Sequence, residues 1–126
     1  MKKMYLLIFT VALVLSACSG PITAPQETSD SVKVQLNKIT IEMTADGFSP
    51  NPVNINAGDT VVFLNKDTVD HWPASAVHPS HQELPGFDAL GPVKPGESYE
   101  FTFSDKGNWR FHDHLNPART GVVVAA

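Results

Sequence analysis

Cysteine is almost absent from this 126-residue sequence, and the single one, Cys18, stands near the N-terminus. One cysteine excludes a disulfide within the chain, and its position leaves no thiolate for a metal site in the domain that follows. Basic residues are also few, since nine Lys and Arg stand against 13 Asp and Glu, for a net charge of −4. This balance argues against binding to nucleic acid, or to anionic lipid through a basic patch. Histidine is missing outside residues 71–114, and helical periodicity of useful length is missing after residue 18.

The N-terminus has the pattern of a secretory signal. Lys2 and Lys3 precede an apolar run over residues 4–15, which is too short for a comfortable membrane span. Residues 15–18, Leu-Ser-Ala-Cys, resemble the bacterial lipobox, in which the cysteine becomes the lipidated first residue. We therefore predict a lipoprotein signal peptide over 1–17, lipidation of Cys18, a flexible tether over 18–36 and one domain over 37–126. The protein would then be anchored in a membrane of the bacterial cell envelope, on the periplasmic or extracellular face. The alternative is an ordinary signal peptide that leaves a free thiol.

The domain has the pattern of an all-β fold. Apolar residues alternate in several short runs, with turn residues between them. The expected strands are a long first strand over 32–43 with a bulge near Asn37, and then 53–55, 60–65, 99–103, 109–113 and 121–124. A long loop over 66–96 carries five of the prolines and three of the histidines, and loops of this length in compact domains are usually functional. The pattern predicts a β-sandwich.

The order of strands and turns resembles a cupredoxin. The residues that carry the resemblance are Phe48–Asp67 followed by His71, then Pro95–Ser98, Phe101–Phe103 and Gly107–Phe111. They are similar to the corresponding parts of small blue-copper domains such as plastocyanin and amicyanin, over residues 38–126. The resemblance implies a Greek-key β-sandwich.

The copper motif departs from the family. Counting back from Gly121, the family's cysteine position holds Asp113, its second histidine position holds Asn116 and its methionine position holds Arg119, so that only His71 is retained. A blue-copper site needs a thiolate, two imidazoles and a weak axial ligand. The sequence therefore excludes blue copper, and with it a plain plastocyanin-type electron carrier.

A rebuilt metal site without sulfur is the hypothesis that the remaining residues favour. His71 and Asp113 would be ligands, with His114 as the second imidazole. His112 and His114 can share one face of a strand, whereas a turn just after Asp113 would favour His114 over His112 as its partner. His78 and His81 could fold over from the long loop and complete the shell. Nitrogen and oxygen ligands favour Cu(II), with zinc as the main competitor.

Other interpretations stay open for several of these residues. His71 could simply hydrogen-bond loop backbone, and Asp113 could form an ion pair with Arg119 that fills the vacated pocket. Asp88 is expected to cap a turn rather than bind metal.

Three function classes follow from these alternatives. The first is a lipid-anchored, copper-binding protein for copper handling or electron transfer, with a redox or copper-delivery protein as partner. The second is a metal-free interaction module, for which Asp113 pairs with Arg119 and the histidines do not converge. An enzyme ranks last, because no acid–base pair or substrate pocket is legible, and we predict that the protein is not one.

Overall fold

The computed structural model describes residue 20 and residues 35–126. The predicted signal peptide, Cys18 and most of the predicted tether lie outside those residues. Within the described part, no helix is long and apolar enough to cross a membrane.

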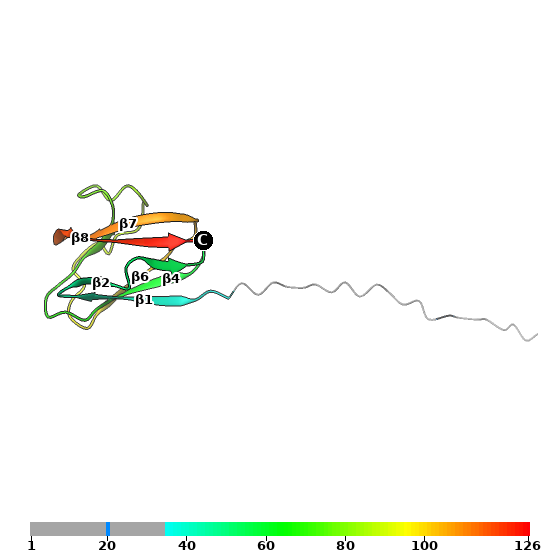
Figure 1. Cartoon of the computed structure of the whole chain (residues 1–126), viewed down its shortest axis with the longest axis horizontal. Coiled ribbons are helices and arrows are strands. Elements are labelled where there is room, and N and C mark those ends of the chain that lie inside the picture. The colour runs from blue at the N-terminus through cyan, green and yellow to red at the C-terminus, as the bar shows by residue number, and fades with distance from the viewer. Residues whose placement is uncertain (1–19, 21–34) are drawn as a thin grey trace, which may run out of the picture. The chain divides into compact units, whose positions relative to one another are not determined.

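The described domain consists of β-strands in two sheets. The strands are β1 (Lys38–Thr44), β2 (Gly47–Ser49), β3 (Val53–Ile55), β4 (Thr60–Asn65), β5 (Pro73–Ser75), β6 (Ser98–Thr102), β7 (Gly107–Asp113) and β8 (Asn116–Ala125). The first sheet has the order β2-β1-β4-β6 and the second the order β3-β8-β7-β5. Figure 1 shows them as two layers, with β1 and β2 in one and β7 and β8 in the other. The predicted all-β sandwich is confirmed.

The core lies between the two sheets and is rich in phenylalanine. In β4 the buried residues alternate with half-buried ones, and Phe63 is fully buried. Its ring lies 5.3 Å from that of Phe111 in the opposite sheet and 5.4 Å from that of Phe87 in the long loop. This contact between rings fixes which face of β7 points inward, and therefore which face is left for other uses.

The first strand is shorter than predicted. The alternation over 32–43 predicts one long strand with a bulge near Asn37, but β1 begins at Lys38, and Leu36 is 61% exposed outside any strand. Asn37 donates its backbone N–H to the Asp59 carboxylate at 3.0 Å instead of to a neighbouring strand.

The loop over 66–96 and the last strand also differ from the prediction. The loop contains β5, and two isolated bridges, His71 with Val93 and Ala74 with Asp88, fold it back on itself. The last strand begins at Asn116 rather than Gly121, because β7 and β8 form a tight hairpin through residues 114 and 115. The hairpin and the folded loop therefore lie next to each other through β5, which pairs with β7.

Candidate metal centre

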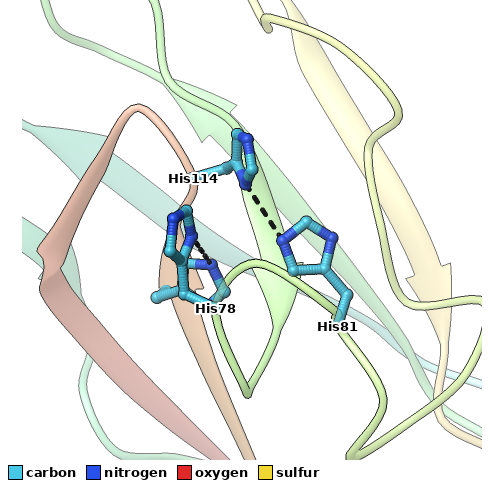
Figure 2. Close-up of side chains that lie close together, drawn as sticks. His78, His81 and His114 are labelled. Carbon is cyan, nitrogen blue, oxygen red and sulfur yellow. Dashed lines mark hydrogen bonds between the residues drawn. The ribbon is translucent and has the colours of Figure 1, made fainter.

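Four histidines from two distant segments gather at one place. His78 and His81 come from the loop after β5, His112 from the end of β7 and His114 from the turn that follows. One ring nitrogen of each lies within 4.8 Å of the corresponding nitrogen of the others. In Figure 2 the rings of His81 and His114 point toward each other, and His78 lies beside them.

The direction of β7 explains why His112 belongs to this group. Phe111 points into the core between the sheets, so the alternation of the strand turns His112 to the outer face of the second sheet. A register shift follows between His112 and Asp113, and the backbone N–H of His114 donates to the carbonyl of Trp72 at 2.7 Å. The chain turns just after Asp113, as one of the two arrangements left open by the sequence required, and His114 in this turn lies in the same group as His112.

The loop that carries His78 and His81 is fastened to β7. Ala76 donates its backbone N–H to the carbonyl of Arg110 at 2.9 Å, and Glu83 donates its own to the carbonyl of Ala76 at 2.7 Å. The Glu83 carboxylate accepts hydrogen bonds from the Arg110 guanidinium and from the Arg110 backbone N–H. His81 itself has a positive φ of 54°, which is uncommon for a residue other than glycine and tends to persist where function holds it.

The four rings meet in two pairs. His81 Nε2 lies 3.0 Å from His114 Nδ1, and His78 Nδ1 lies 3.3 Å from His112 Nε2. In a tetrahedral site with metal–nitrogen bonds of about 2.0–2.1 Å, ligand nitrogens lie about 3.3 Å from one another. The distances within the two pairs are close to that spacing, and all four nitrogens lie within 4.8 Å of one another. The donor set therefore fits a divalent metal of the copper or zinc type.

Asp88 and Trp72 support the centre from behind. The Asp88 carboxylate lies 2.6 Å from His81 Nδ1 and accepts a hydrogen bond from Trp72 Nε1 at 2.6 Å. The Trp72 ring lies 4.5 Å from the ring of His114. A carboxylate on the far nitrogen of a ligand histidine fixes its tautomer and orients the near nitrogen toward the metal. Asp88 also accepts the backbone N–H of Leu90 at 2.8 Å, which confirms the predicted turn cap.

The electrostatics favour the charged form of Asp88 and the neutral form of His112. Burial opposes the charge on Asp88, but hydrogen bonds from Trp72, from the Leu90 backbone and from His81 outweigh it, and the pKa of Asp88 lies below its ordinary value. Burial lowers the pKa of His112, and the neighbouring imidazoles lower it further against the opposing effect of Asp113. A neutral imidazole is the form that binds metal.

His71 and Asp113 are placed elsewhere, in a buried polar cluster. His71 Nδ1 lies 2.7 Å from Asp113 Oδ2, and His71 Nε2 lies 3.0 Å from Asp67 Oδ2. Both ring nitrogens of His71 thus face carboxylates of the protein and not the four-histidine centre. Asp113 also accepts the backbone N–H groups of Trp72 and Leu115 through Oδ1. Six metal ligands were predicted from the sequence. Four of them converge in the histidine cluster, whereas His71 and Asp113 lie apart from it and bind each other.

Arg119 does not form the ion pair with Asp113 that the sequence left open as an alternative. Its guanidinium donates to the carbonyls of Thr44 at 2.8 Å and Ala45 at 2.6 Å, and it lies 3.8 Å from the carboxylate of Asp67. Asp67 is therefore the carboxylate shared by His71 and Arg119, and it was not among the site residues predicted from the sequence.

Several solved structures have a similar fold. A purple cupredoxin from Nitrosopumilus maritimus matches with a TM-score of 0.61 and 24% identity, over 69% of this chain and 98% of that one. A Cu(I) form of an amicyanin mutant matches with a TM-score of 0.57 and 20% identity, over 71% and 82% of the two chains. A copper-containing nitrite reductase from Thermus scotoductus SA-01 matches with a TM-score of 0.61 and 22% identity, over 71% of this chain and 22% of that longer one. At these identities the likeness is one of fold.

The sequence itself also matches a family. The model of the family described as "Cupredoxin-like domain" covers residues 6–125, which is nearly the whole chain. Together with the two-sheet sandwich, this match shows that the chain belongs to the family of cupredoxin-like domains.

Proposed function

We propose that this protein binds one divalent copper ion at His78, His81, His112 and His114 and serves copper handling in the cell envelope. The observation that supports this most strongly is the meeting of four imidazole nitrogens within 4.8 Å, from segments more than 30 residues apart in the chain. His81 and His112 are buried, and the neighbouring imidazoles disfavour a positive charge on His112, so the neutral form that binds metal is favoured there.

Two arguments favour copper over zinc, namely the nitrogen ligands and the copper named for proteins of similar fold. Affinity for nitrogen ligands is highest for Cu²⁺ among the first-row divalent ions, so zinc is the competitor rather than the preferred ion. The purple cupredoxin, the Cu(I) amicyanin and the copper-containing nitrite reductase belong to copper chemistry by their names.

Metal handling is favoured over rapid electron transfer. Blue-copper sites combine a thiolate with a weak axial ligand, and neither is present among the four residues of this centre. Four imidazoles stabilise Cu(II) and offer no soft sulfur ligand for Cu(I). We infer that the protein is not an enzyme and that its partner is a copper-delivery protein rather than a fast redox carrier.

The metal-free alternative predicted two features, histidines that do not converge and an Asp113–Arg119 pair. The described residues contain the opposite arrangement, because the histidines meet and Arg119 binds backbone carbonyls. Neither of the two features that the metal-free alternative predicted is present among the described residues.

The lipid anchor is part of the proposal. Lipidation of Cys18 would place the domain on a membrane of the envelope, with residues 18–36 as a tether. Expression of the full chain and of Cys18→Ser, followed by separation of membrane and soluble fractions, tests this. The anchor would be excluded if both proteins fractionated alike and neither carried fatty acid.

A copper titration tests the central claim. The mature chain with Cys18→Ser is titrated with Cu(II) in the presence of a competing chelator, and its electron paramagnetic resonance spectrum is recorded. One tight equivalent with nitrogen hyperfine structure is expected. His81→Ala and His114→Ala should lose it, whereas His71→Ala, the matched control, should keep it. Copper that binds no more tightly than to the chelator, or equally in all variants, would refute the proposal.

A further inference from the structure

A cavity of about 340 Å³ opens on one side of the four-histidine centre. Its floor is the outer face of the β7–β8 ladder, where Arg110 is paired with Val122 and His112 with Thr120. Its wall is formed by residues 76–78 of the loop and by Pro117. Two of the four histidines, His78 and His112, therefore lie in the lining of the cavity.

The centre is closed on one side and accessible on the other. Behind it, Trp72 and Asp88 cover His114 and His81. On the cavity side His78 is exposed, although His81 and His112 are buried. A molecule that approaches the metal from solvent would meet it through the cavity, next to His78.

The charges at the centre favour an anion there. Four neutral imidazoles cancel none of the two positive charges of a divalent ion. Among the described residues, the carboxylate that hydrogen-bonds to one of the four rings is that of Asp88, which offsets one of those charges. Arg110 adds no excess positive charge because Glu83 pairs with it. Apolar side chains such as Val77 and Val122 line the cavity, and a low-dielectric wall strengthens the attraction between the metal and an anion.

We propose that this cavity admits a small monodentate anion, which binds the metal as an additional ligand on the side of His78 and His112. The inference rests on the proposed copper site. The cavity of about 340 Å³ leaves ample room for a ligand of a few atoms to reach His78 and His112, and the loop over it is fastened to β7 by the Glu83–Arg110 contact.

Azide is a suitable probe, because its binding to Cu(II) produces a charge-transfer absorption band. The copper-loaded mature chain with Cys18→Ser is titrated with azide, and the band and the electron paramagnetic resonance spectrum are followed. The first cavity-filling variant is Thr120→Phe, which places a ring beside His112. The second is Val122→Phe, whose cross-strand neighbour is Arg110 and not one of the four histidines. The matched control is Val124→Phe, which lies on the same face of β8 but outside the lining of the cavity.

Each outcome decides one of two questions. Saturable azide binding that weakens about tenfold or more in Thr120→Phe and Val122→Phe, but not in Val124→Phe, supports the inference. If all variants bind one copper and azide binds them equally, or binds none, the cavity is not a ligand site and the copper proposal stands. If the wild-type chain binds no copper, both proposals are overturned together. If one cavity-filling variant fails to bind copper, the other one is used in the comparison. If both fail while Val124→Phe binds copper, the inference is overturned, because the filled space would then be needed for metal binding itself.

Discussion

His71 Nδ1 lies 2.7 Å from Asp113 Oδ2, and this contact holds both side chains apart from the four-histidine centre. Both residues were among the metal ligands predicted from the sequence. In this chain they bind each other, and Asp67 binds the other nitrogen of His71. The histidines on either side of Asp113 in sequence, His112 and His114, belong instead to the four-histidine centre.

The first prediction concerns His71. Replacement by Ala should leave copper binding intact but destabilise the fold, because it leaves the buried Asp113 carboxylate without a partner at one oxygen. Loss of a hydrogen bond to a buried charged group costs about 3 kcal/mol. Urea denaturation measures the stability and the chelator competition measures the copper affinity. A variant that is fully stable but has lost its copper would show that His71 is a ligand after all.

The second prediction concerns Asp88. Asp88→Asn should lower copper affinity about 10–100-fold, because the amide cannot accept hydrogen bonds from both His81 and Trp72 as the carboxylate does. Asp46→Asn is the matched control, since Asp46 is an exposed carboxylate in the turn between β1 and β2. Both variants are compared in the same chelator competition, with the hyperfine pattern as a second readout. Equal affinities for Asp88→Asn and Asp46→Asn would remove Asp88 from the role of positioning His81.

The third prediction concerns pH. Burial, and then the neighbouring imidazoles, lower the pKa of His112 below its ordinary value. The unfolded chain therefore takes up a proton near pH 6.5 that the folded chain resists. In the metal-free protein, the contribution of neutral His112 to the free energy of unfolding is complete above pH 6.5. It declines as the pH falls below 6.5 toward the lowered pKa. Urea denaturation between about pH 5 and 8, a range in which carboxylates stay ionised, should show the decline in the wild type.

His112→Gln is the comparison for this pH effect. It removes the titrating ring, so its stability should depend less on pH over the same range. An NMR titration of the His112 ring protons in the wild type should give a midpoint below the ordinary histidine value. A midpoint at or above that value would contradict the argument.

The fold could be predicted because it depends on local patterns. Thr60–Asn65 alternates buried and half-buried residues and is flanked by turn residues, and the predicted strand is the observed one. The first strand was predicted too long because alternation continues into a segment where Leu36 has no partner strand to bury it. The alternation of apolar residues predicts which face of a strand is buried, but it does not predict the residue at which pairing with the neighbouring strand ends.

The centre could be predicted only in part because it depends on tertiary distances. All four of its histidines were among the predicted ligands, but the sequence could not rank His78 and His81 above His71. That ranking depends on Asp67 and Asp113, which occupy both nitrogens of His71, and on Glu83 and Arg110, which fasten the loop over β7. These contacts join residues far apart in the chain, and no local sequence pattern predicts them.

The last prediction concerns Gly121, which faces Phe111 across the β7–β8 ladder. A Cβ at this position would overlap the Phe111 ring, and the ring cannot retreat because it packs against Phe63. Gly121→Ala should therefore destabilise the domain by about 1–3 kcal/mol, as overpacking of a dense core does. It should also weaken copper binding, since movement of Phe111 shifts the neighbouring His112. Gly91→Ala is the matched control, because a Cβ there meets no atom within 4 Å and the backbone is not in the left-handed region. Urea denaturation and chelator competition on both variants separate the two effects. Equal stability of the two variants would mean that Phe111 can move, and that the position of His112 does not depend on how tightly the core is packed beneath it.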